Sequence, residues 1–525
     1  MRIKEYTYCD CTEEENQYAD CYCEGNSILD ARYVHSLVNM DKGNPYIEAL
    51  PYPRSDTAVQ YDYTKILLDY NYDDVKKMTK LEKMLNVGTL RNIRFPLMFH
   101  KNLEFALYNS LITSYRARSI MEDENDPSQM ILCGDSGAST NAGFSLIGYS
   151  GCGKSSAINI LLSRYPQVIL HETEYGDKVP QVVYLVVNCV PNSNFSALYE
   201  GIGDALDKAF HLTQPIYADQ VRKTTGLGKK MEVIRQYIEQ FGIGIIIFDE
   251  IQLLDFSKTK ENSFESLMIL SNRTKVAIAV VGTEDARDKM FSELRTARRI
   301  GTMINGNMYC EHREFFEFLV KQLFQYQWFD KSIELDSSLT AALYDTTKGI
   351  VDQLIGIYSC MHYEYLTRKQ KPVINADYVY KVAKKYYPGL QTILADMESL
   401  SNTAKIKKIR DDANKAIQHT IDQVQQEEAG QSIITNQAII AQNQNQLRNV
   451  ASIVRVLYDN YTDTQIETAY AHVIKRKGSA DKTEKEICRE VVAYIQKQEA
   501  GKALNDAAIV HNEFNIVDKI GVTSP

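Results

Sequence analysis

The stretch FSLIGYSGCGKSSAINILL, residues 144 to 162, runs from an apolar segment through a glycine turn into a helical pattern. Its spacing is G-x-x-x-x-G-K-S, which is typical of a loop that cradles the phosphates of a nucleotide. Glycines let the backbone wrap closely around phosphate, and the following helix adds unpaired N–H groups and the positive end of its dipole. The residues expected to line this cradle are Gly148, Tyr149, Ser150, Gly151, Cys152, Gly153, Lys154, Ser155 and Ser156.

The chemistry expected around the loop requires ATP and Mg²⁺. Lys154 would reach the outer phosphates, and the Ser155 hydroxyl would hold the metal ion. A second apolar run, IGIIIFDEIQLL, ends in Asp249 and Glu250. Asp249 would orient Mg²⁺, and Glu250 would polarise the attacking water. The adjacent acid pair therefore favours hydrolysis of the nucleotide over mere binding.

Two further segments complete the predicted machinery. The run KVAIAVVGTEDA places Thr283 at the end of a third strand, between the two central strands, where it would sense the outermost phosphate. The segment SELRTARRIGTM carries three arginines, of which Arg298 or Arg299 is predicted to act on the nucleotide of a neighbouring subunit. An arginine that acts in this way demands a ring or a filament of copies.

Composition bounds the class of protein. The chain has 525 residues, of which 44% are hydrophobic and 24% charged, as in globular proteins. No run approaches the roughly 20 apolar residues that span a bilayer, so no membrane association is expected and a cytoplasmic location is predicted. Residues 1 to 30 hold eight acids and two bases, a charge of −6 within the total of −9, which leaves about −3 elsewhere. This balance argues against a nonspecific polybasic binder, but it leaves local DNA contacts open.

The N-terminal region contains a cysteine cluster. Cys9, Cys11, Cys21 and Cys23 form a C-x-C…C-x-C pattern. Four thiolates can hold Zn²⁺, although structural zinc sites usually use wider C-x₂₋₄-C spacing. Reduced cysteines without metal are the alternative, since ten cysteines in an intracellular chain are ordinarily free thiols.

The predicted fold class is α/β: a P-loop core with a parallel sheet, then an all-α lid and a helical C-terminal extension. Wholly apolar strands that alternate with helices indicate a parallel sheet covered on both faces. The predicted divisions are an N-terminal accessory region with the cysteine cluster (1–90), the ATPase core (91–310), the lid (311–400), an Asn/Gln-rich linker (401–450), and a helical pair with a partner-binding tail (451–525).

The order of these motifs resembles the AAA+ ATPase superfamily, and its details resemble the TnsC/TniB family of transposition regulators. The resemblance covers roughly residues 90 to 395 and rests on GYSGCGKSS, FDEIQLL, VVGTEDA, LRTARRIG and TKGIVDQLIGIY. The segment GIVDQ departs from many AAA+ lids, because it offers Asp352 where they carry a second sensor arginine.

The resemblance implies a regulator of DNA transposition that assembles with ATP on double-stranded DNA. It would link a target-selector protein to the transposase and its nuclease subunit, and it would disassemble when ATP is hydrolysed. In initiator-like members of the superfamily, loops that face the pore hold DNA. The corresponding segment here, DQVRKTTGLGKKMEV, offers Arg222, Lys223, Thr224, Thr225, Lys229 and Lys230.

Two alternatives remain open. A signalling or defence NTPase would use the same phosphate site to switch oligomerisation without DNA. A replication initiator or helicase loader would also share the site, but it would be expected to carry a basic DNA-reading domain. The acidic helical pair near residues 451 to 498 does not resemble such a domain.

Overall fold

The computed structural model describes residues 3–10, 16–18, 28–67, 70–122, 130–135, 143–190, 194–254, 264–284, 286–287 and 301–387, together with parts of 447–497. The contacts divide the chain into two compact units, one with residues 1–65 and 78–402, the other with residues 66–77 and 403–525. The divisions predicted at residues 90 and 310 thus lie inside the first unit.

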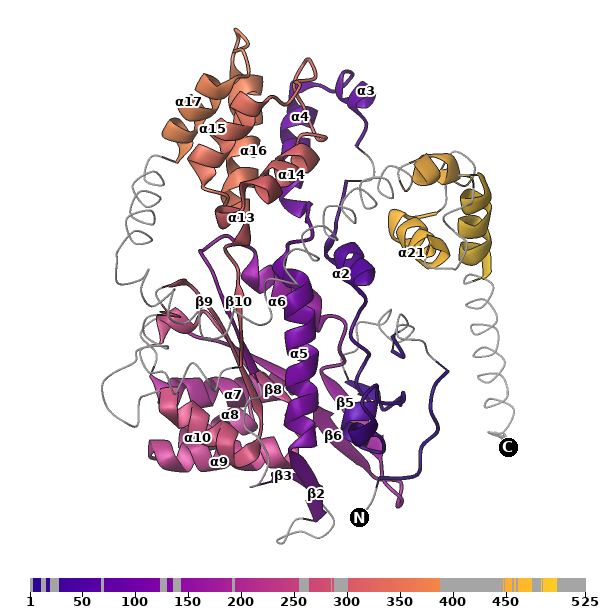
Figure 1. Cartoon of the computed structure of the whole chain (residues 1–525), viewed down its shortest axis with the longest axis vertical. Coiled ribbons are helices and arrows are strands. Elements are labelled where there is room, and N and C mark those ends of the chain that lie inside the picture. The colour runs from indigo at the N-terminus through magenta and orange to yellow at the C-terminus, as the bar shows by residue number, and fades with distance from the viewer. Residues whose placement is uncertain are drawn as a thin grey trace, which may run out of the picture. The chain divides into compact units, whose positions relative to one another are not determined.

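A five-stranded parallel sheet forms the centre of the first unit (Figure 1). Its spatial order is β10-β4-β9-β8-β7. The strands are β4 (Gly143–Ile147), β7 (Tyr184–Asn188), β8 (Ile245–Asp249), β9 (Ala277–Gly282) and β10 (Thr302–Asn305). This order places β9 between the strand that leads into the phosphate loop and the strand that ends in Asp249. The α/β fold with a parallel sheet that the sequence predicts is confirmed.

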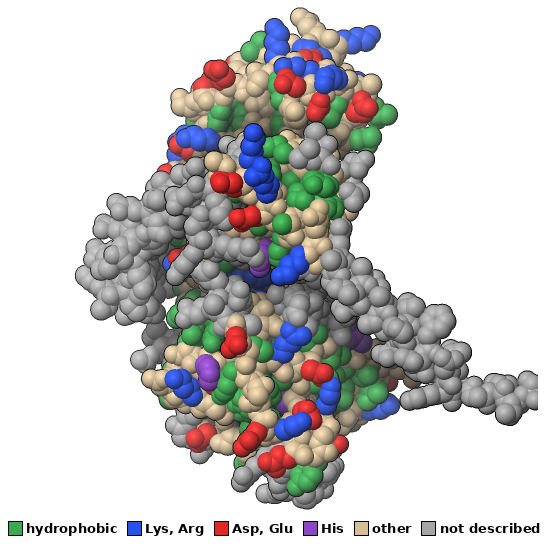
Figure 2. Space-filling model, turned by 90° about the vertical axis from the view of Figure 1, so that its right-hand side faces the viewer, with side chains coloured by type: hydrophobic (Ala, Val, Ile, Leu, Met, Phe, Trp, Pro, Cys, Tyr) green, Lys and Arg blue, Asp and Glu red, His purple; other side chains and the backbone are tan. Residues whose placement is uncertain are grey.

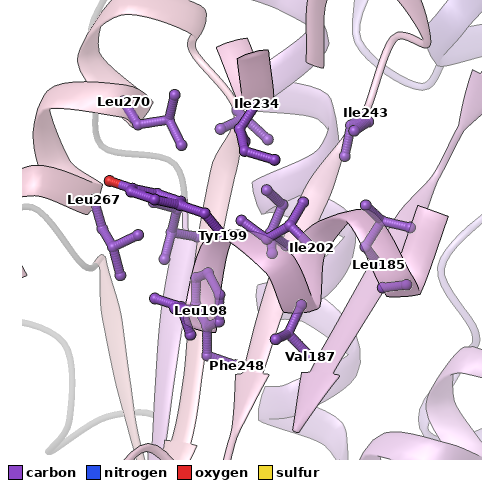
Figure 3. Close-up of a cluster of buried hydrophobic side chains, with 14 of the residues drawn as sticks. Leu185, Val187, Leu198, Tyr199, Ile202, Ile234, Ile243, Phe248, Leu267 and Leu270 are labelled. Atoms are coloured by element: carbon purple, nitrogen blue, oxygen red, sulfur yellow. The ribbon is translucent and has the colours of Figure 1, made fainter. Parts of the chain in front are cut away.

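Helices cover both faces of this sheet. The central strands β8 and β9 are buried along their whole length, which is why their sequences are continuously apolar. On one face, Leu185, Phe248 and Ile278 join side chains from α7 (Phe195–Ala209), α9 (Leu227–Gln240) and α10 (Phe264–Thr274) in a single core (Figure 3). The helix α8 (Tyr217–Lys223) contributes Val221 to the same core.

The other face of the sheet carries α5 (Phe99–Arg116), which runs across four of its strands, and α6 (Lys154–Leu162). Two side chains of α5 bind backbone carbonyls near the start of β8. The Ser114 hydroxyl donates to the oxygen of Gly244 at 2.8 Å, and the Tyr115 hydroxyl donates to that of Gly242 at 3.1 Å. These buried hydrogen bonds fix the position of α5 against the sheet.

Two smaller β elements accompany the central sheet. A three-stranded sheet has the order β1-β5-β6, formed by β1 (Ile28–Asp30), β5 (Val168–Glu172) and β6 (Lys178–Val182). A hairpin pairs β2 (Arg118–Glu122) with β3 (Met130–Gly134). Because β1 pairs with β5, the N-terminal residues are integrated into the first unit.

Short helices fill the rest of the N-terminal part. They are η2 (Asn39–Asp41), α1 (Pro45–Glu48), α2 (Asp56–Tyr63), α4 (Lys80–Val87) and η3 (Gly88–Asn92), while η4 (Ile251–Leu253) follows β8. Thr79 and Glu82 form a reciprocal capping box that begins α4. This helix packs on the lid, where Lys83 pairs with Asp330 at 3.0 Å.

The region from 308 to 386 is helical, as predicted. It consists of α13 (Met308–Glu311), α14 (Arg313–Leu323), α15 (Ser337–Thr347), α16 (Val351–Thr367) and α17 (Ala376–Tyr386). The left-handed Lys348 and Gly349 end α15 and turn the chain into α16. The Tyr344 hydroxyl donates to the carbonyl of Cys310 at 2.8 Å and ties α15 to the first helix of this group.

The second unit contains α3 (Tyr72–Val75), α21 (Asp463–Ile474) and helical residues 449–455 and 485–497. Its core joins Ile66 to the two predicted helix faces, which include Ile466, Tyr470, Ile487 and Val491. At the start of the last helix, the Thr483 N–H and hydroxyl both donate to Glu486 at 2.8 and 2.7 Å. The predicted helical pair is thus present. The linker predicted to run to residue 450 ends earlier, because Leu447 and Val450 are buried in the core of this unit. The rest of the predicted linker and the tail beyond residue 497 lie outside the described residues.

Candidate nucleotide-hydrolysis site

The phosphate loop joins β4 to α6, as its sequence predicts. Gly151 and Gly153 have positive φ angles of 86° and 87°, which side chains of other residues rarely adopt. At Gly148 the constraint is space, because an added Cβ would lie 2.9 Å from the Cα of Gly306. The helix α6 begins at Lys154, directly after Gly153. The loop therefore presents its backbone, rather than side chains, at the N-terminus of a helix.

The Lys154 side chain lies inside this loop. Its ammonium donates to the carbonyls of Gly148 and Tyr149, both at 2.8 Å. Burial lowers the pKa of Lys154, while the nearby carboxylates of Glu250 and Asp249 act in the opposite direction. The ammonium thus lies within the electrostatic reach of the acid pair. Ser155 is half-buried and Ser156 is exposed on the first turn of α6.

The acid pair lies at the carboxyl end of β8. Asp249 is buried, with 9% of its surface exposed, and its Oδ1 accepts the Glu250 N–H at 2.8 Å. Glu250 is exposed and has a left-handed backbone with φ 56°, a strained conformation for a residue with a side chain. Gln252 donates from its Nε2 to the Glu250 carboxylate, which holds that side chain in place. Strain of this kind often accompanies a functional site.

Thr283 follows β9, next to the acid pair. Its backbone N–H donates to Gln252 Oε1 at 3.1 Å, so Gln252 bridges Thr283 and Glu250. The Thr283 hydroxyl is buried, and among the described residues it has no hydrogen-bond partner. A buried hydroxyl without a partner is costly, and a phosphate oxygen or a water beside it would satisfy the group.

The main residue that sequence reasoning missed is Asn307, which is 3% exposed. Its Oδ1 accepts the Tyr149 N–H at 2.6 Å, and its Nδ2 donates to Glu284 at 2.7 Å. It therefore joins the phosphate loop to the residue after Thr283. Asn307 follows β10, a strand that the apolar pattern did not reveal.

The lid also contacts the phosphate loop. The Asp352 N–H donates to the carbonyl of Gly151 at 3.1 Å, and a Cβ on Gly151 would lie 3.0 Å from Ile350. Asp352 pairs with Arg91 at 3.5 Å. The lid therefore offers an acid at this position, and the cation beside it comes from η3.

The residues of this site fit a nucleoside triphosphate with Mg²⁺. The loop offers backbone N–H groups and an ammonium, Ser155 and Asp249 would supply oxygen ligands for the metal, and Thr283 offers a hydroxyl that has no partner among the described residues. When bound, the metal ion would neutralise phosphate charge. Lys154 would bind the outer phosphates, and Glu250, steadied by Gln252, would accept a proton from water.

Several other predicted site residues lie outside the described part of the chain. These are the arginine candidates Arg298 and Arg299, and three of the cysteines, Cys11, Cys21 and Cys23. The predicted zinc site gains no support. Cys9 is described, and its N–H donates to the Tyr33 carbonyl at 2.8 Å, but no cluster of metal-binding side chains occurs within the residues that the structure covers.

The six residues of the predicted DNA contact lie on α8, on α9 and in the turn between them. Lys223, Thr225 and Lys229 are exposed, whereas Arg222 pairs with Asp204 at 2.7 Å. The Thr224 hydroxyl donates to the Gln220 carbonyl. Lys230 must be corrected, because it is 7% exposed and pairs with Glu200, which makes it a structural ion pair rather than a free cation.

Three comparisons with known proteins bear on this site. A model of the AAA domain family matches residues 120–290, a span that contains the phosphate loop, the acid pair and Thr283. No curated protein matches.

In the described part of the chain, no helix has the length and apolar character needed to cross a membrane.

Solved structures resemble the chain only distantly. The Walker-type ATPase PABY2304 of Pyrococcus abyssi has 13% identity and a TM-score of 0.28, over 50% of this chain and 71% of its own. The Hsp104–ADP complex of S. cerevisiae has 12% identity and a TM-score of 0.23, over 68% of this chain and 44% of its own. On the family match and the strand order, residues 120–290 form an AAA domain of the P-loop NTPase family, a domain that generally binds ATP with Mg²⁺ and hydrolyses it.

Proposed function

We propose that this protein is an ATP-dependent, DNA-binding regulator of DNA transposition. It assembles on target DNA with ATP, links a target-selector protein to the transposase, and disassembles when the ATP is hydrolysed. The AAA domain supplies the hydrolysis, and the sequence resemblance to TnsC/TniB regulators supplies the role. The hydrolytic part rests on one observation: Lys154, Thr283 and Glu250 follow the carboxyl ends of three adjacent parallel strands, β4, β9 and β8.

Lys223 and Lys229 are the proposed contacts to the DNA backbone. Both are exposed, on either side of a turn in which Gly226 has a φ of 91°. No ion pair of either lysine is found among the described residues, whereas Arg222 and Lys230 are paired. Free cations beside small residues suit phosphate contacts that do not read sequence. Figure 2 shows acidic and basic side chains interspersed on the face that it displays.

The test is a double substitution, Lys223→Ala with Lys229→Ala. If each lysine neutralises one phosphate, the slope of log affinity for duplex DNA against log salt falls in magnitude by about 2, equally for unrelated sequences. The matched control is Lys381→Ala with Lys384→Ala, which removes the same charge from exposed positions on α17 and should leave the slope unchanged. Equal slopes for both variants would refute the proposed contact.

A nucleotide-driven signalling switch is the competing function. It shares the hydrolysis site but not the DNA, so the two differ in what triggers assembly. Analytical ultracentrifugation with a non-hydrolysable ATP analogue, with and without duplex DNA, separates them. Assembly that depends on the duplex supports the transposition regulator, and equal assembly without the duplex supports the switch.

A further inference from the structure

An ion pair joins the segment before the core to the lid, next to the phosphate loop. Arg91 of η3 and Asp352 of α16 lie 3.5 Å apart, measured from Nη1 to Oδ1. Both side chains are exposed, over 64% and 53% of their surfaces. The hydrolytic chemistry described above uses neither residue, and an exposed ion pair of this length adds little to stability. Its position, rather than its strength, is what bears on function.

Asp352 lies against the phosphate loop. Its N–H donates to the carbonyl of Gly151 at 3.1 Å. A Cβ built on Gly151 would lie 3.1 Å from the Cβ of Asp352 and 3.9 Å from its Oδ2. A carboxylate this close to the loop repels the phosphates of an incoming nucleotide. An acid at this position therefore opposes binding unless a cation neutralises it.

The fold holds Arg91 beside that carboxylate. The helix α4 and the following η3 both pack against α16, and Figure 1 shows α4 beside this part of the lid. A Cβ on Gly88, at the start of η3, would lie 3.6 Å from the Tyr363 hydroxyl of α16. The chain after η3 then reaches the phosphate loop, where a Cβ on Gly153 would lie 3.2 Å from the Leu97 side chain. Arg91 thus belongs to a segment that contacts the lid at one end and the loop at the other.

We propose that Arg91 is a nucleotide-binding residue that pairs with Asp352 when no nucleotide is bound and turns to the phosphates when one is. The phosphate chain of a nucleoside triphosphate carries more negative charge than a single carboxylate, so it competes well for the guanidinium. A guanidinium presents five N–H donors in a planar fork that matches phosphate oxygens. Because the Arg91 side chain is largely exposed, it has the freedom to turn between the two acceptors.

The two residues then act on nucleotide affinity in opposite directions. Arg91 attracts the phosphates, whereas Asp352 repels them and also competes with them for Arg91. Both effects grow with the charge of the ligand, so a triphosphate gains more from Arg91 than a diphosphate does. The pair would thus help the site to distinguish ATP from ADP. The inference rests on nucleotide binding at this loop, which belongs to the proposed function, and it requires neither DNA nor transposition.

The test measures the Kd of the full-length protein for fluorescent analogues of ATP and ADP, by titration with Mg²⁺ at constant ionic strength. Arg91→Gln should weaken ATP binding about tenfold, the effect of losing one charge-assisted hydrogen bond, and should weaken ADP binding less. Asp352→Asn should strengthen ATP binding about threefold, because it removes a negative charge beside the loop.

Two matched controls remove the same charges elsewhere. Arg94→Gln changes another exposed arginine of the same segment. Asp377→Asn changes an exposed acid in the first turn of α17, whereas Asp352 lies in the first turn of α16. Both controls should leave ATP affinity within about twofold of the wild type. The urea midpoints of all four variants should stay close to that of the wild type, because these side chains are exposed.

A structural ion pair would behave differently, because breaking it from either side would change affinity in the same direction. The inference is refuted if Arg91→Gln binds ATP as tightly as the wild type, or if Asp352→Asn binds it no more tightly. Either result, with ATP still bound by the wild type, leaves the proposed function standing. Failure of the wild type itself to bind ATP would instead refute the hydrolytic part of that function together with this inference.

Discussion

Replacing Asn307 with alanine tests how the phosphate loop is held. The substitution removes an acceptor from the Tyr149 N–H, at 2.6 Å, and a donor to the Glu284 carboxylate, at 2.7 Å. The site is nearly closed to water, since Asn307 is 3% exposed. Alanine therefore leaves both partners without their hydrogen bond, and the loop loses its link to the residue that follows Thr283.

The size of the effect follows from these two contacts. A buried group that loses its partner costs about 1–3 kcal/mol, and a bond to a charged group lies at the upper end of this range. Tyr149 and Glu284 are each only partly buried, so water can replace part of the loss. We expect the free energy of unfolding to fall by about 3 kcal/mol. If about 1.4 kcal/mol of this loss must be made up when the loop becomes ordered around bound nucleotide, ATP affinity falls about tenfold.

Two measurements check this expectation: urea unfolding without nucleotide, and titration with a fluorescent ATP analogue. The control is Asn159→Ala, on the exposed side of α6, which should change stability by less than about 0.5 kcal/mol. A large loss of stability with unchanged ATP affinity would show that Asn307 supports only the fold. An effect no larger than that of Asn159→Ala would refute the reasoning altogether.

Three other outcomes are expected. Glu250→Gln should lower the rate of ATP hydrolysis by about 10²–10³-fold while nucleotide affinity stays within about threefold, as measured by phosphate release and analogue titration, because the amide cannot accept the proton of water. Thr283→Ala should lower the rate about tenfold with little loss of stability in urea, because its hydroxyl has no partner among the described residues to lose; a marked loss of stability would contradict this. Burial lowers the pKa of His171 to about 4 and that of His362 to about 3, whereas an unfolded histidine titrates near 6.5. Between pH 6.5 and about 4 the unfolded chain binds more protons, so stability falls as pH drops, by up to about 1.4 kcal/mol per pH unit for each histidine. The urea midpoint should therefore decrease from pH 7.5 to pH 5, and His362→Phe should flatten this dependence.

The central strands were predictable because burial on both faces leaves a continuous apolar run, as in β8 and β9. The strand β10 was not, because it has only four residues, of which Ile304 alone is buried, and Thr302 and Asn305 interrupt the apolar run. The largely apolar run QVVYLVVNCV, residues 181 to 190, has the pattern of one strand, but the chain divides at Val183 between β6 and β7, which belong to different sheets. That division depends on pairing with distant segments, which local periodicity does not record.

The same limit applies to the site. Lys154, Asp249 and Glu250 carry fixed spacing relative to glycine or to the end of an apolar strand, so their positions could be predicted. Asn307 carries no such spacing. It comes to the phosphate loop because β10 pairs with β4, which puts the residues after Asn305 beside the residues after Ile147. The short segment TMINGNM gave no local signal of this neighbourhood.

Three connections make the phosphate loop a junction between the sheet and the lid. Asn307 accepts from both Tyr149 and Cys152 of the loop and donates to Glu284 beyond β9, and Asp352 donates its N–H to Gly151. Each connection reaches a different residue of the loop, and the one from Asp352 begins on the lid. A change in the loop when phosphate binds or leaves must therefore strain or release contacts to the lid. In the proposed function, this is the route by which hydrolysis would alter the surface that the lid presents to a neighbouring copy.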